Sequence, residues 1–151
     1  MLFVCRNTER MIEMSMQSID FNSGNYKEYA INGDENRVIS INVSDVGIIT
    51  RIQDAMSKVD NIAEEVSERE KNEDRTQLLK EYDQRAREMV NDIFGSDVCT
   101  AALESVNVFS VASNGKPVLV NFLEALLVVV MQEIKSAQTA AQIKLEEKVE
   151  K

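Results

Sequence analysis

Two apolar stripes at helical spacing constrain this fold more than any other feature of the sequence. From residue 45 to about 71, and again from about residue 76 to 94, apolar side chains recur at steps of three and four, which places them on one helix face. The stripes comprise Ile49, Ile52, Met56, Val59, Ala63 and Val66 in the first helix, and Leu79, Tyr82, Ala86, Met89 and Ile93 in the second. Because only a short polar segment separates them, the two helices are predicted to pair as an antiparallel hairpin.

Capping residues mark the ends of this hairpin. Ser44 or Asp45 offers a side-chain oxygen as the first N-cap, and Gly95 fits the left-handed position that ends the second helix. Residues 72–74 favour a break between the two helices. The competing interpretation is one continuous helix through residue 94. The first stripe could also form the seam of a coiled-coil dimer. We favour pairing within the chain, since the second stripe supplies a matching surface.

The β-like region is confined to residues 18–43. Ile19 and Phe21 alternate with polar residues, and a second short run covers residues 26–31. Asn32-Gly33-Asp34 is a strong turn signal, because Asn and Gly tolerate positive φ. A third run follows with alternating Ile39, Ile41 and Val43. The pattern predicts an antiparallel sheet of two or three strands that lies on the helices, since so small a sheet is not stable alone.

The last predicted helix is apolar on almost every side. Ser96 or Asp97 first caps a short helix over residues 98–104, and Pro117 then opens the last helix, which runs to about Glu147. One face carries Leu119, Phe122, Leu123, Leu126, Val130 and Ile134, and Val118, Ala125 and Val129 widen it. A helix that is apolar all round must be buried all round. Burial in the core is therefore the prediction, and an interface with another chain is the alternative.

Together these elements predict a mainly α protein with a small N-terminal antiparallel β element, an α+β class built from a helical hairpin and a long C-terminal helix. Residues 1–17 are expected to be a tail, either disordered or preceding the natural start. Residues 18–151 are expected to form a single, mainly helical domain with a charged C-terminal helical extension. The apolar run at residues 118–131 falls short of the ~20 residues that span a bilayer, so we expect no membrane partner.

Composition excludes several kinds of chemistry. The chain carries 26 acidic and 17 basic residues and no His, for a formal charge of −9, which argues against nucleic-acid binding. Cys5 and Cys99 lie far apart, so we expect free thiols in a reducing compartment, with no zinc site and no Cys–His pair. We predict no catalytic residue, no metal and no cofactor, and therefore no enzyme. The acidic surface favours solubility first, and contact with a basic partner second.

The order of parts resembles the tail assembly chaperones of long-tailed bacteriophages and prophages. The resemblance covers roughly residues 18–150 and depends on Phe94-Gly95 followed by an acidic cap and a short helix. Its other elements are the acidic β segment Ile19-Asp20-Phe21-Asn22, the stretch Ala101-Ala102-Leu103, and a Phe-containing last helix with a charged end. The resemblance implies a non-catalytic protein of the bacterial host cytoplasm that coats the tape-measure protein before tail tube subunits polymerise, and that is absent from the virion.

Partner-binding residues are predicted within this framework. We expect Phe94, Phe109, Phe122 and Leu126 to contact the tape-measure protein, with the tail tube protein as a further partner and homo-oligomerisation left open. Two other functions are the alternatives. One is a coiled-coil adaptor that dimerises through residues 49–66, and the other is a minor structural or tail-completion protein of the virion.

Overall fold

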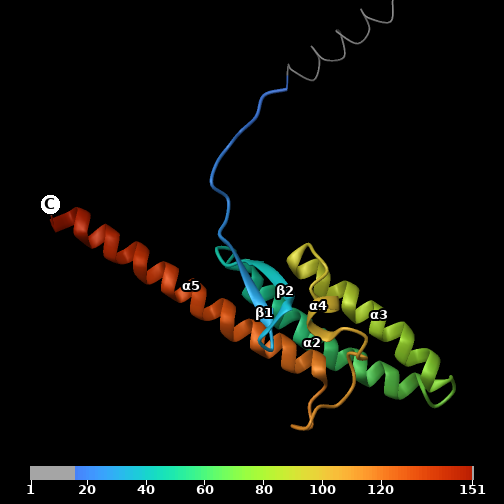
Figure 1. Cartoon of the computed structure of the whole chain (residues 1–151). Coiled ribbons are helices and arrows are strands. Elements are labelled where there is room, and N and C mark those ends of the chain that lie inside the picture. The colour runs from blue at the N-terminus through green and yellow to red at the C-terminus, as the bar shows by residue number, and fades with distance from the viewer. Residues whose placement is uncertain (1–15, 151) are drawn as a thin grey trace, which may run out of the picture.

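The computed structural model describes residues 16–150 (Figure 1). In chain order its elements are β1 (Tyr26–Ile31), β2 (Asp34–Asn42), α2 (Gly47–Arg69), α3 (Arg75–Phe94), α4 (Cys99–Leu103) and α5 (Val118–Glu150). The predicted α+β class is confirmed, with a two-stranded antiparallel sheet, a helical hairpin and a long last helix. Residues 1–15 of the predicted tail, which include Cys5, lie outside the described residues.

The β-hairpin forms at the predicted turn. Asn32 and Gly33 have φ of 50° and 76°, the left-handed backbone that a tight hairpin turn requires. Beyond it, Ile39 and Ile41 are buried against the helices. Of the predicted two or three strands, two form; the run with Ile19 and Phe21 lies outside the sheet, and both of these side chains are exposed. Alternation alone does not make a strand when neither a neighbouring strand nor a packed face is available to it.

A bulge in β2 connects the β-hairpin to α4. Ala30 pairs with Val38 but Ile31 pairs with Asp34, so residues 35–37 are additional on the β2 side. The Arg37 side chain donates from Nε to the carbonyl of Ala101 at 2.8 Å and from Nη2 to that of Ala102 at 2.6 Å. These carbonyls belong to the last turn of α4, where no helical N–H reaches them and a positive charge is favoured. The bulge thus places a cation at the end of a helix.

The α2–α3 hairpin is confirmed, and the single continuous helix is wrong. The chain leaves α2 after Arg69 and re-enters a helix at Arg75, where the Asp74 carboxylate accepts the Thr76 N–H at 3.2 Å. Arg69 braces the turn by donating to Glu73 and to the Tyr82 hydroxyl. The pairing within the chain is also confirmed, because α2 packs against α3 and buries Ile52, Val59 and Val66 of the stripe that could have formed a dimer seam.

The buried line on each helix is rotated by about one residue from its prediction. In α2 it runs through Ile48, Ile52, Ala55, Val59 and Val66, and in α3 through Leu78, Tyr82, Ala86, Val90 and Ile93. Ala63 is exposed, while Ile49 and Met56 are half-buried. The reason is that α2 packs against both α3 and α5, so its most buried line points between its two neighbours. The predicted N-cap is also wrong by a residue, since the cap is Val46, and Asp45 instead accepts the Gly47 N–H.

The connection between α3 and α4 follows part of its predicted chemistry, although the N-cap of α4 is Val98 and not the predicted Ser96 or Asp97. Gly95 has φ of 66° at the end of α3, as expected for a left-handed C-cap. The Asp97 carboxylate then accepts the Thr100 N–H at 3.1 Å and the Thr100 hydroxyl at 2.6 Å, which supports the first turn of α4. Asn91 accepts the N–H groups of Val98 and Cys99, so α4 is fixed to α3 by side chain as well as by backbone.

Helix α5 is covered on one side only. Leu119, Leu123, Leu126, Val130 and Ile134 are buried against α2 and the sheet. The expectation that this helix is buried all round is wrong, because Val128 and Met131 are 56% and 49% exposed. From residue 135 to 149 every side chain is exposed, and Figure 1 shows this part of α5 projecting beyond the rest of the chain. Within the described residues, no helix is both long and apolar enough to cross a membrane.

Candidate functional site: an apolar groove between the sheet and the last helix

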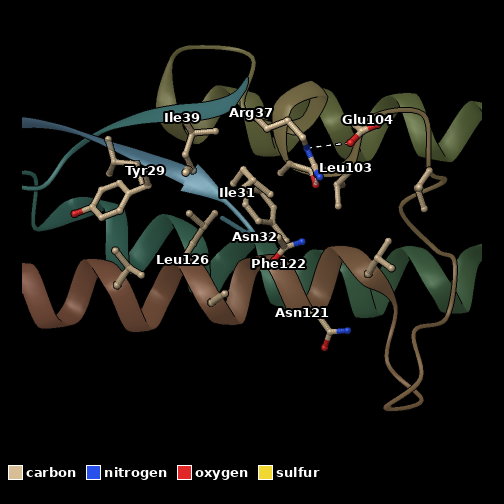
Figure 2. Close-up of a pocket in the computed structure, with 17 residues that line it drawn as sticks. Tyr29, Ile31, Asn32, Arg37, Ile39, Leu103, Glu104, Asn121, Phe122 and Leu126 are labelled. Carbon is tan, nitrogen blue, oxygen red and sulfur yellow. Dashed lines mark hydrogen bonds and ion pairs between the residues drawn. The ribbon is translucent and has the colours of Figure 1, made fainter. Parts of the chain in front are cut away.

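An open groove of about 580 Å³ lies between the β-hairpin, α4 and α5 (Figure 2). Its walls come from segments up to a hundred residues apart in the sequence, so it exists only in the folded chain. The lining consists of Tyr29, Ala30, Ile31, Asn32, Arg37, Ile39, Ile41, Ala102, Leu103, Glu104, Val106, Val118, Asn121, Phe122, Ala125, Leu126 and Val129. Most of these side chains are hydrocarbon, as in a site that binds apolar surface.

Helical spacing and strand alternation produce the two long walls. On α5, Val118, Phe122, Ala125 and Val129 recur at steps of four and three, which sets them on one face of the helix. The opposite wall comes from alternate residues of the hairpin, and Figure 2 shows Tyr29 and Ile31 reaching from β1 towards α5. So small a domain cannot cover both faces of the sheet. The end of the sheet that lines the groove lies opposite a part of α5 that is incompletely covered.

Polar side chains gather at the α4 end of the groove. The Arg37 guanidinium lies 3.0 Å from the Glu104 carboxylate while it also holds the carbonyls of α4, so the ion pair fixes one corner of the wall. Glu104 has φ of 51°, an unusual left-handed backbone for a side chain with a Cβ. Asn32 also lines the groove, and Figure 2 shows Asn121 on the α5 side, away from this ion pair. Such a corner provides orientation for a bound partner, and the apolar walls provide the contact area.

A second polar network ties the hairpin to α5 beyond the groove. Lys27 donates to one oxygen of Glu133 at 2.7 Å, and the Tyr29 hydroxyl donates to the other at 3.1 Å. The hydrogen bond from Lys27 holds the pKa of Glu133 below its usual value. Burial, followed by the interaction with Glu133, raises the pKa of Tyr29. Both pKa shifts favour the protonation states that keep these hydrogen bonds, an ionised Glu133 carboxylate and a protonated Tyr29 phenol. These contacts therefore hold the β1 wall of the groove in position against α5.

The structure brings together two of the four predicted partner-binding residues. Phe122 and Leu126 both line the groove, although Leu126 is only 4% exposed and forms part of its floor. Phe94 packs on the main core at the end of α3, outside the groove. Phe109 packs against both the main core and a small separate cluster of Val66, Leu78 and Tyr82. Its loop is fixed by the hydrogen bond from the Val108 N–H to Asp83 at 2.8 Å.

Sequence reasoning missed the groove residues of the hairpin. Tyr29 and Ile31 alternate along a strand that was expected to lie on the helices, so the signal for one apolar face was present. What the alternation did not specify was which part of that face would remain uncovered. This depends on where α5 crosses the hairpin, and no local pattern encodes that crossing.

The described cysteine offers no reactive group. Cys99 is fully buried, and burial raises the pKa of its thiol to about 11, so the nucleophilic thiolate is disfavoured. Its Sγ donates to the carbonyl of Arg87 at 3.8 Å. Within residues 16–150, no three Cys, Asp or Glu side chains group in a way that could hold a metal ion.

No protein-family model matches this chain, and searches of curated proteins and of solved structures returned no match either. Function must therefore be inferred from the groove and from the resemblance in sequence layout.

Proposed function

We propose that this chain is a non-catalytic tail assembly chaperone of a long-tailed bacteriophage or prophage, and that its groove binds helical segments of the tape-measure protein. The single observation that carries the proposal is the open apolar groove between the β-hairpin and α5. The sequence resemblance, which covers roughly residues 18–150, supplies the identity of the client. The proposal places the protein in the host cytoplasm during assembly and outside the finished virion, with the tail tube protein as a further partner.

A helix is the client shape that suits these walls. An amphipathic helix lays apolar side chains at steps of three, four and seven into a groove of this kind. The α5 wall itself presents Phe122, Ala125 and Val129 at the complementary spacing. The affinity of each contact can be modest, because many copies bound along one long client would together keep it from aggregating.

Co-expression with the tape-measure protein tests the proposal. A tagged chain should keep the client soluble and co-purify with it in many copies. Val129→Glu places a charge in the groove and should abolish this effect. Val128→Glu is the matched control, because Val128 is the neighbouring residue, is 56% exposed and does not line the groove.

Two results would count against this function. If the client stays insoluble beside the wild-type chain, the chaperone proposal fails. If Val129→Glu performs as well as Val128→Glu, the groove is not the client site. Detection of the chain in purified virions would instead indicate the alternative of a minor structural or tail-completion protein.

A further inference from the structure

We propose that this chain forms a two-fold symmetric dimer in which residues 18–22 of each copy add a strand to the free edge of β1 in the other copy. The added strand widens the apolar hairpin wall of the groove with Ile19 and Phe21 of the second copy. This inference goes beyond the proposed function, because it concerns association of the chain with itself and requires no client.

Strand β1 has a free edge. Within the described residues the sheet has two strands, so β1 is paired on one side only. The Val43 N–H donates to the Asn25 carbonyl at 2.8 Å, and backbone groups alternate between the two edges of a strand. The N–H and C=O groups of Tyr26, Glu28 and Ala30 therefore point away from β2. Such a row of backbone groups is a template for a further strand.

Residues 18–22 have the pattern of a strand and no strand to pair with. Ile19 and Phe21 alternate with polar residues and are 88% and 75% exposed. None of residues 18–24 shares a backbone hydrogen bond with another described residue. In an extended chain that leads into β1, the even residues present their backbone groups to the same edge as Tyr26 and Glu28. Two such edges, related by a two-fold axis, can pair as antiparallel strands.

The apolar side chains select the register of this pairing. With Asn25 of both copies at the axis, Phe21 lies opposite Tyr29 of the other copy and Ile19 lies opposite Ile31. Tyr29 and Ile31 form the hairpin wall of the groove, and Figure 2 shows both reaching towards α5. Because directly opposed residues share one face of a sheet, the two exposed side chains join this wall. The groove therefore lacks part of its wall in a single copy.

Other registers are less favourable. In the proposed register, Asn22 lies opposite Glu28 and Asp20 lies opposite Ala30. A shift by two residues either sets Asp20 opposite Glu28, which brings like charges together, or carries Ile19 past the end of β1. A shift by one residue turns the apolar side chains to the solvent face. The charges and the apolar residues thus favour the same alignment.

The start of β1 explains why the added strand comes from a second copy. The Asn25 N–H donates to the Asn42 side chain at 3.0 Å, and Gly24 lies so close to Asn42 that a Cβ would come within 2.8 Å of it. These contacts direct the chain straight out of the sheet, and Figure 1 shows it running away from β1. To pair with its own β1 in this register, the chain would need residues 23–27 as a turn, which would undo the first pairs of β1 with β2.

Cysteine cross-linking tests the register. Asn25→Cys sets two thiols opposite each other at the axis, in a non-hydrogen-bonded pair with Cα atoms about 4.5 Å apart, which a disulfide can bridge. Ser23→Cys is the control, because its two copies lie four residues apart along the strands, about 13 Å. Both variants carry Cys5→Ser, and Cys99 is buried. Mild oxidation should convert most of Asn25→Cys, and little of Ser23→Cys, into a covalent dimer.

Sedimentation velocity over a concentration series measures the strength of association. The wild-type chain should sediment as a concentration-dependent dimer. Asn22→Pro removes an N–H that faces the second copy, at two symmetric positions, so the dissociation constant should rise at least about tenfold. Ser23→Pro is the matched control, because its N–H faces away from the second copy, and it should stay within about threefold of the wild type. Both positions are exposed and outside the helices and strands, so circular dichroism should show an unchanged fold.

Three results would overturn the inference: a monomeric wild-type chain, equal cross-linking of the two cysteine variants, or equal association of the two proline variants. These measurements use no client, so they are independent of the proposed function. If the dimer forms as described and the tape-measure protein stays insoluble, the dimer stands and the chaperone function falls. If the wild-type chain is a monomer that keeps the client soluble, the function stands and the dimer falls.

Discussion

Helices α2 and α5 bury their apolar residues to very different extents. In α2, Ile52 and Val59 are 0% and 1% exposed, because α3 and α5 cover the helix along this line. In α5, Leu119 and Leu123 are buried just as fully, yet Val128 and Met131 on the same helix are about half exposed. Neighbouring elements therefore cover the most apolar line of α2. In α5 the apolar residues are more numerous than the neighbouring elements can cover.

This difference in burial distinguishes residues that form the core from residues that are candidates for an interface. A narrow stripe on one face is satisfied by two neighbouring helices, and its residues then stabilise the fold. A helix that is apolar all round needs neighbours on every side, and this small domain supplies them on one side only. The groove face of α5, where Phe122 and Val129 are only half-buried, is where binding should be sought, and α2 is where substitutions should affect stability.

The strongest test of this division is Val59→Lys in α2. The variant should lose about 4 kcal/mol or more of unfolding free energy, because a charged side chain replaces a fully buried apolar one. Urea denaturation measures the loss, and Ser57→Lys, at an exposed position two residues away, should stay near the wild type. A Val59→Lys chain of normal stability that had changed from dimer to monomer would favour the coiled-coil adaptor instead.

Next in expected size is a comparison of the two sides of α5. Leu123→Ala removes a fully buried side chain and should cost about 3 kcal/mol. Val128→Ala, on the exposed side, should cost less than about 0.5 kcal/mol. Chemical denaturation of both variants gives the difference, and equal costs would mean that α5 is covered on both sides.

Substitution of Arg37, at the polar corner of the groove, should cause a smaller loss of stability. Arg37→Gln should destabilise the chain by about 2 kcal/mol, because it weakens the contacts to the carbonyls of Ala101 and Ala102 and breaks the ion pair with Glu104. Lys27→Gln breaks the pair with Glu133 and should cost less than about 1 kcal/mol, because the Lys27 side chain is 46% exposed against 23% for Arg37. Hydrogen exchange of α4 should rise in the first variant only. Unchanged exchange would show that Arg37 does not hold α4.

The smallest effect is expected at the cap of α4. Asp97→Ala should cost about 1 kcal/mol at neutral pH. Hydrogen bonds from Thr100 hold the pKa of the Asp97 carboxyl below its usual range, so its contribution is present above the unfolded pKa of about 4 and lost as the pH falls through the lower folded value. The gap between wild type and variant should therefore narrow between pH 7 and pH 3. A gap of constant size would rule out the ionised carboxylate as its source.

The sequence predicts local features of this fold more successfully than contacts between elements. The turn at Asn32-Gly33, the cap at Gly95 and the break before Arg75 depend on a few adjacent residues, and each is found as expected. The exposure of Val128 and the placement of Phe94 outside the groove depend on how far other elements extend over a surface. Phe122 and Leu126, which the sequence predicts as partner-binding, both line the groove. Tyr29 and Ile31 line it too, but they could not be predicted, because their place in the groove depends on where α5 crosses the hairpin.

Hydrogen exchange of the chain, alone and in complex with the tape-measure protein, tests the central claim most directly. We expect the client to slow exchange in β1 and along the groove wall of α5 from residue 118 to 129, and to leave α2 unchanged between residues 52 and 66. Protection of α2 with no change along α5 would contradict the account, because the groove wall of α5 would then not be the docking surface.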